Sequence, residues 1–180
     1  SFEPDRTSVR RLLSEIGHVT QGGRVTGLLS QVLGRCQQAR LPKDVMDEVE
    51  LAIGRIGQSV EGALRQLDTF YDRIEDFVAE QKGDRPSRYS FRMRLGSGIR
   101  VQPAWDAIEI ACDDLDRPVR VAVGELEKLA GGLDELVASY DLPDADELQV
   151  QMLGMAQHLE EVRAKISHMV MDPSDSLIYW

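Results

Sequence analysis

Aromatic residues are scarce in this sequence: four Phe, four Tyr and two Trp make up 6% of the chain. This scarcity suits a helical core of Leu, Ile and Val better than a β-sandwich. Cysteine is rarer still, because only Cys36 and Cys112 are present, and they lack the spacing of metal ligands. We therefore expect both to be reduced core residues of a cytoplasmic protein.

Long apolar runs and the common catalytic motifs are also missing. The chain contains no stretch of about 20 apolar residues that would cross a bilayer, and no basic, apolar-cored leader. It has neither a Gly-rich phosphate loop nor a Gly-x-Gly-x-x-Gly motif after a strand. The three histidines, His18, His158 and His168, do not share the spacing of a metal site. We accordingly expect no membrane contact, no bound cofactor or metal, and no catalytic residue in these 180 residues.

Basic residues are outnumbered, with 21 Lys and Arg against 31 Asp and Glu, and the formal net charge is -10. Acidic runs such as Asp113-Asp114 lie in helical patterns, where such runs usually form the solvated face. This net charge argues against strong DNA binding by the chain as a whole, since that affinity depends on cations.

What the sequence does contain is a heptad pattern in three long stretches. Apolar residues recur there at alternating spacings of three and four, which is typical of helices that pack along a seam. The pattern predicts helices over about 42–81, 103–140 and 146–169, with Pro118 producing a bend in the second. The apolar positions are Val49, Ile53, Ile56, Val60, Ala63, Leu67, Phe70, Ile74 and Phe77; Trp105, Ile108, Cys112, Leu115, Val119, Ala122, Leu126, Leu129, Leu133, Leu136 and Tyr140; and Leu148, Met152, Met155, Leu159, Val162, Ile166 and Met169.

Two shorter helices are predicted before these, over 7–16 and about 24–39. Asp5 is the expected N-cap of the first, and Gly17 its end. The first long helix would span about 57 Å over roughly 38 residues, which is too long for a compact globule to cover. Each seam is buried only by a neighbour, so the prediction is a mainly α, elongated antiparallel helical bundle forming one domain over 1–180.

Residues 85–105 do not fit a helical pattern. From Tyr89 to Leu95 apolar and polar residues alternate, which predicts a strand with one apolar and one basic face. Gly96-Ser97-Gly98 suits a tight turn, and 99–101 suits a short return strand, so we expect a β-hairpin element near 88–102 between two long helices. Strand 89–95 has two alternative partners, 99–101 and the β-prone 177–180.

This stretch carries five arginines and one nearby acid, Asp84, within an acidic chain. Its functional interpretation is an interface that contacts phosphates through arginine and stacks bases on aromatic rings. The alternative is an arginine face that pairs with acids of neighbouring helices. The candidate nucleic-acid-binding residues are Arg88, Arg92, Arg94 and Arg100, with Tyr89 and Trp105 for stacking.

An Arg-Met-Arg-Leu strand, a turn, Pro-x-Trp opening a long helix, a second long helix and a closing Asp-Pro-x-x-x-Leu-Ile-Tyr-Trp together resemble part of a known family. They are similar to an internal segment of DinG-type DNA helicases, bacterial relatives of XPD. The residues that carry the resemblance are Arg92, Arg94, Leu95, Pro103, Trp105, Tyr179 and Trp180.

The resemblance implies an arch, a helical insertion that clamps single-stranded DNA against the motor domain of an ATP-dependent helicase. The expected partners are therefore single-stranded DNA and the motor domains of a larger parent protein, of which this chain would be an internal segment. The site for ATP and Mg would lie in that parent. The four iron–sulfur cysteines that some members carry are missing here, and no catalytic residue can be transferred.

A hypothesis of a different class is a helical interaction module without a nucleic-acid role. The heptad seams would then bind a protein partner or a second copy of the chain. The third long helix is the best candidate surface, because methionine adapts to varied apolar partners. Its methionines are Met152, Met155, Met169 and Met171.

Overall fold

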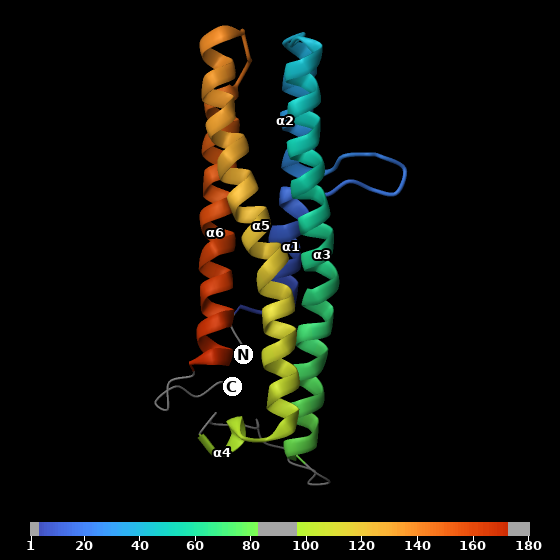
Figure 1. The fold of residues 1–180 in the computed structure, drawn as a ribbon, viewed down its shortest axis with the longest axis vertical. Helices are drawn as coiled ribbons and strands as arrows, with labels where there is room; N and C mark the ends of the chain where they lie inside the picture. The colour runs from blue at the N-terminus through green and yellow to red at the C-terminus, as the bar shows by residue number, and fades with distance from the viewer. Residues whose placement is uncertain (1–3, 83–96, 173–180) are drawn as a thin grey trace.

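The computed structural model describes residues 4–82 and 97–172, and the structural statements below concern these residues. They form a mainly helical fold, as predicted, and no helix among them is both long and apolar enough to cross a membrane. In chain order the helices are α1 (Arg6–Ile16), α2 (Gly27–Gln38), α3 (Lys43–Lys82), α4 (Ser97–Arg100), α5 (Pro103–Ser139) and α6 (Ala145–Met171) (Figure 1).

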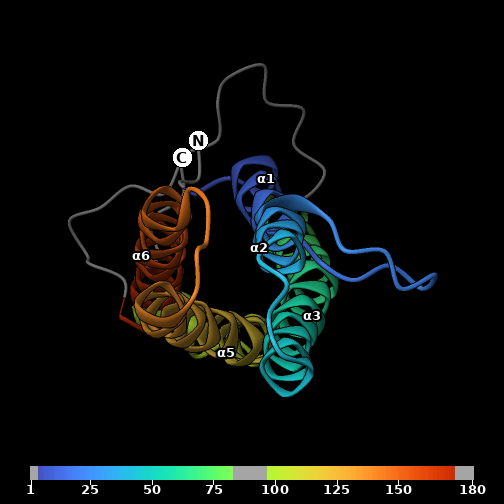
Figure 2. The same ribbon diagram turned by 90° about the horizontal axis from the view of Figure 1, so that it is seen from above.

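Four rods make up the body of the molecule. Helices α3, α5 and α6 are three of them, and α1 followed by α2 forms the fourth, packed against α3 and α6 (Figures 1 and 2). Successive rods run in opposite directions, which is the up-down-up-down arrangement of a four-helix bundle. The expected elongated antiparallel bundle is therefore present, with its first rod interrupted.

The two ends of this bundle differ, and we name them by their residues. At the loop end, α3 finishes at Lys82, and α4 and the start of α5 lie nearby (Figure 1). At the corner end, residues 39–42 join α2 to α3, and residues 140–144 join α5 to α6.

The predicted seams are the core. Every predicted seam position on α3 is buried, and so are the α5 positions from Trp105 to Leu133. On α6 all the seam positions are buried except Met155, which is partly buried. The seams thus face one another inside the bundle, where each apolar side chain leaves water.

The first rod is interrupted by a small hairpin. An antiparallel bridge joins Val19 to Val25, and the backbone N–H of Thr26 donates to the carbonyl oxygen of His18 at 3.0 Å. Gly17 and Gly27 both have positive φ, and an added Cβ on Gly17 would lie 1.9 Å from the carbonyl oxygen of Thr26. Only glycine fits where the backbone at Gly17 passes this close to residues 26 and 27. Because the hairpin occupies the residues before it, α2 begins at Gly27, and the predicted start near Arg24 was wrong.

The predicted hairpin near 88–102 is not supported. Ser97–Arg100 is the helical turn α4 instead of the expected turn and return strand. The N–H of Gln102 donates to the carbonyl oxygen of Ile99 at 3.2 Å, and the N–H of Trp105 donates to that of Gln102 at 2.9 Å. These local bonds satisfy backbone groups that a strand would need for pairing. The predicted strand 89–95 and its alternative partner 177–180 lie outside the described residues.

Pro118 lies inside α5, which continues through it as one helix. Figure 1 shows α5 running beside α3 from the loop end and leaning away from α3 toward the corner end. A Cβ added to Gly62 of α3 would lie 3.5 Å from Cβ of Pro118, so the proline faces a glycine across the interface. A proline removes one helical hydrogen bond and crowds the preceding turn, which accounts for the change of direction.

Candidate nucleic-acid interface

The loop end is closed by an aromatic pair between α3 and α5. The rings of Phe77 and Trp105 meet edge to face, with centroids 5.5 Å apart and an interplanar angle of 68°. Nearby, the side-chain amide Nε2 of Gln81 donates to Oε1 of Gln102 at 2.9 Å. These two contacts therefore hold the end of α3 against the start of α5.

The structure places two of the six predicted site residues. Trp105 is 4% exposed and packs in the core, so this conformation offers no free ring face for stacking on a base. Arg100 is partly buried in α4, beside the start of α5. The remaining predicted residues lie outside the described ranges, so their predicted contacts stay predictions: Arg88, Tyr89, Arg92 and Arg94.

Charge is distributed unevenly between the two ends. The sequence from 82 to 100 has six Lys or Arg and one acid, Asp84, and it links α3 to α4 at the loop end. Residues 134–147, at the corner end, contain six Asp or Glu and neither Lys nor Arg. Acids also lie near the loop end, where residues 68–80 of α3 contain five Asp or Glu and one Arg. The basic segment is therefore a local reversal of charge within an acidic chain, and nearby carboxylates act against anion binding there.

Along the rods, arginines pair with acids of neighbouring helices. Arg163 of α6 donates to Asp116 of α5 at 2.7 Å and to Glu160 at 2.6 Å, and these hydrogen bonds raise the pKa of the guanidinium. Arg6 of α1 similarly contacts Asp72 of α3 at 2.7 Å. The alternative interpretation, in which arginine pairs with acids of neighbouring helices, therefore describes the arginines along the rods. It stays a prediction for the arginines of 83–96.

Both cysteines are buried, as expected, and neither has the environment of a reactive thiol. Burial raises the pKa of Cys36. Burial, with a smaller contribution from Asp113, Asp116 and Glu109, raises the pKa of Cys112 to about 12. Within residues 4–82 and 97–172, no three His, Cys, Asp or Glu side chains gather as metal ligands would.

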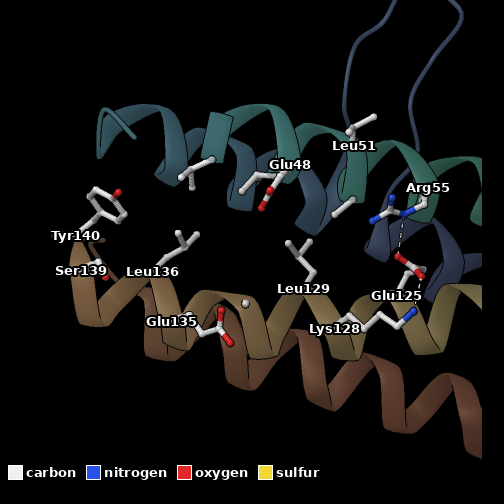
Figure 3. A pocket seen from close by; sticks show the side chains of 14 residues that line it. Glu48, Leu51, Arg55, Glu125, Lys128, Leu129, Glu135, Leu136, Ser139 and Tyr140 are labelled. Carbon is white, nitrogen blue, oxygen red and sulfur yellow. Dashed lines mark hydrogen bonds and ion pairs between the residues drawn. The ribbon is translucent and has the colours of Figure 1, made fainter. Parts of the chain in front are cut away.

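A groove at the corner end was not predicted from the sequence. It has a volume of about 550 Å³ and lies between the start of α3 and the end of α5 (Figure 3). Arg55 of α3 crosses to Glu125 of α5, with Nε to Oε2 at 3.0 Å, and Lys128 contacts the same carboxylate at 3.0 Å. These two contacts hold the pKa of Glu125 below its usual value and close one end of the groove, whereas Tyr140 lies at the other.

Two features were not predicted from the sequence: the small hairpin that joins Val19 to Val25, and the corner-end groove. Only the hairpin has a signal in the sequence. The symmetric Val19-Thr20 and Val25-Thr26 flank Gly22-Gly23, which is a hairpin pattern, although glycine pairs also occur as simple helix breaks. The groove has no comparable signal, because the heptad pattern continues unbroken through Leu136 to Tyr140 and gives no sign that α5 leaves α3.

Comparisons with known protein families, with curated proteins and with solved structures found no match for this chain.

Proposed function

We propose that this chain is a non-catalytic accessory domain that guides single-stranded DNA at its loop end, similar to the arch of DinG/XPD-type helicases. The bundle holds the basic 83–96 segment between α3 and α4, and the grip comes from arginine contacts with phosphates. ATP, Mg and the motor domains belong to the larger parent protein that this proposal requires.

The observation that carries the proposal is the basic segment itself, because residues 82–100 of an acidic chain contain six Lys or Arg and one acid. Helix α3, which has 40 residues and is about 60 Å long, is a stiff support for one end of this segment. The contact between Phe77 and Trp105 joins the end of α3 to the start of α5. A short basic segment held at both ends needs less ordering when it binds a strand than a free tail does.

The test is binding of a fluorescent oligo-dT strand to the protein at several salt concentrations. We expect the Arg88→Ala, Arg92→Ala, Arg94→Ala triple variant to bind more weakly. Its slope of log affinity against log salt should flatten by about 0.7 for each phosphate that the variant no longer neutralises. A triple variant with unchanged affinity and unchanged slope would remove the proposed role.

The matched control changes three arginines of helices α3 and α5 to Ala: Arg65, Arg73 and Arg117. All three are exposed, and the change of net charge is identical. The control should bind the strand nearly as well as the natural chain, apart from a small general effect of charge. Equal reductions in affinity in both triple variants would mean that the protein attracts DNA only through its overall charge.

The rival hypothesis, a module that associates through its seams, is weakened at its main surface. Met152 and Met169 are fully or almost fully buried inside the bundle, and Met171 is the exposed member of the set. The seams are therefore occupied within one chain. The observation that still favours protein binding is the corner-end groove, which is a separate surface.

A further inference from the structure

The apolar heptad positions of α5 continue beyond the part of the helix that the other helices bury. Leu129 and Leu133 are buried, whereas Leu136 and Tyr140, which continue the same seam, are only partly buried and line the corner-end groove. On the opposite wall, Ala52 of α3 is partly buried and Leu51 is 63% exposed. The groove thus has an apolar floor made from core-type positions that no other part of the described chain covers.

The groove has the dimensions of a short helix. Its α3 wall runs from Val45 to Arg55 and its α5 wall from Glu125 to Tyr140, or about 15 Å and 22 Å of helix. The walls are two antiparallel helices that separate toward the corner end (Figure 1). A helix of about 11–15 residues would match the length of these walls and lie along them, with its apolar side chains entering the groove.

The negative charges at the rim of the groove favour a cationic partner. Glu48 from α3 and Glu135 from α5 are exposed on opposite walls, and neither has an ion-pair partner within the described ranges (Figure 3). The two cations that line the groove, Arg55 and Lys128, both bind Glu125 at its closed end. A cationic occupant would neutralise the free carboxylates, whereas a second copy of this acidic chain would add further negative charge.

The remaining segments of this chain do not suit the groove. Residues 173–180 contain one acid, Asp175, and neither Lys nor Arg, so they lack the positive charge that the rim favours. Residues 83–96 are anchored at both ends, so their middle extends at most about 25 Å from Lys82. Arg55 lies 27 residues back along α3, or about 40 Å away.

We propose that the corner-end groove binds an amphipathic helix of a partner protein that carries Lys or Arg beside its apolar face. The apolar side chains contact Ala52 and Leu136, and the flanking cations contact Glu48 and Glu135. This interaction lies at the opposite end from the basic segment and does not depend on DNA binding there.

The probe is a synthetic 14-residue peptide of Leu and Lys, with Leu placed at helical spacing so that one face is apolar. A permuted peptide of the same composition without an apolar face, and a Leu/Glu peptide with the same pattern, are the comparisons. By calorimetry and NMR titration we expect the Leu/Lys peptide to bind at least 10-fold more tightly than either. Its chemical-shift changes should cluster at residues 45–55 and 125–140.

Two variants test the site itself. Gly132 lines the groove, and an added Cβ there would meet no atom within 4 Å, so Gly132→Trp is chosen to place its ring in the groove. We expect it to weaken peptide binding at least 10-fold, and Glu48→Lys with Glu135→Lys to do the same. The control, Asp113→Lys with Glu127→Lys, makes the same charge change at exposed α5 positions outside the groove and should alter binding less than twofold.

Several results would overturn the proposal. Equal binding of the permuted peptide, equal weakening in the control variant, or full binding by Gly132→Trp would reveal only general attraction to an acidic protein. No binding of the Leu/Lys peptide would refute the site outright. Self-association in sedimentation experiments that Gly132→Trp abolishes would assign the groove to a second copy. Oligo-dT binding measured in parallel is expected to be unchanged, so the two proposals fail separately.

Discussion

The two ends of the bundle solve the same packing problem differently. At the loop end, α3 and α5 stay together and bury Phe77 against Trp105, with a hydrogen bond between Gln81 and Gln102 alongside. At the corner end the same two helices separate, and the seam finishes in the partly exposed Leu136 and Tyr140. One end is closed by its own core, and the other leaves core-type residues for a partner. Heptad spacing alone therefore specifies which residues face inward, without specifying whether they are covered.

The largest difference between the ends should appear on truncation of their apolar residues. Trp105→Ala is expected to lower the free energy of unfolding by about 3–5 kcal/mol, because it leaves a cavity in a closed core. Leu136→Ala should cost only about 1 kcal/mol, since much of this side chain already meets water. Urea unfolding followed by circular dichroism measures both. Similar costs would mean that the corner end is as well packed as the loop end.

A smaller effect is expected at Pro118 inside α5. Pro118→Ala restores one helical hydrogen bond and removes a steric conflict, so we expect the free energy of unfolding to rise by about 1–2 kcal/mol. A straighter α5 would also narrow the groove and weaken binding of the Leu/Lys peptide. Thermal unfolding and the peptide titration check the two parts. Lower stability with unchanged peptide binding would show that the proline packs favourably and does not set the groove.

Glycines inside the helices allow a finer comparison. A Cβ at Gly131, near the corner end, would meet no atom within 4 Å, so Gly131→Ala should stabilise the chain by about 0.5–1 kcal/mol through helix propensity. Gly57 is the matched control in mid-bundle, because a Cβ there would lie 3.1 Å from the backbone nitrogen of Val19. Gly57→Ala should therefore destabilise the chain. Opposite signs in denaturant unfolding are the expected result, and equal signs would contradict this packing.

The smallest effect concerns Glu125, whose hydrogen bonds with Lys128 and Arg55 lower its pKa in the folded chain. The folded state then binds fewer protons than the unfolded state, so this contribution is present above the unfolded pKa of about 4.3 and disappears as pH falls through the lower folded value. Glu125→Gln should cost about 0.5–1 kcal/mol at pH 7 and less below pH ~4. Urea unfolding at both pH values tests this, with Glu127→Gln as the control. A cost that grows in acid would refute the sign.

Much of the fold followed from residue spacing, since every seam position from Val49 to Phe77 is buried. Asp5 accepts from the N–H of Ser8 and Gly17 ends α1, as their chemistry predicted. Alternation of apolar and basic residues was less informative: 99–101 has the pattern of a strand, but local hydrogen bonds around Ile99 and Gln102 favour a helical turn. Short segments lack the many repeats that make a heptad pattern reliable.

The candidate site was less predictable than the fold for a physical reason. Arginine in an acidic chain is visible in the sequence, but whether Trp105 is a stacking platform or a core residue depends on Phe77, 28 residues away. The groove likewise depends on where two helices part, and such contacts as that of Pro118 with Gly62 across the interface cannot be read from one helix alone. The spacing of apolar residues along one helix carries little information on which residue of another helix each of them will contact.

The start of α1 and the end of α6 both lie toward the loop end, well away from the corner end (Figure 1). Tyr71 of α3 secures the beginning of α1 there by donating a hydrogen bond to the carbonyl oxygen of Pro4. A body gripped near these positions would behave as a lever with a distant free tip. Rotation by about 5° there would move the corner end, about 40 Å away along α6, through about 3.5 Å, which would shift a helix docked at that end relative to a neighbour.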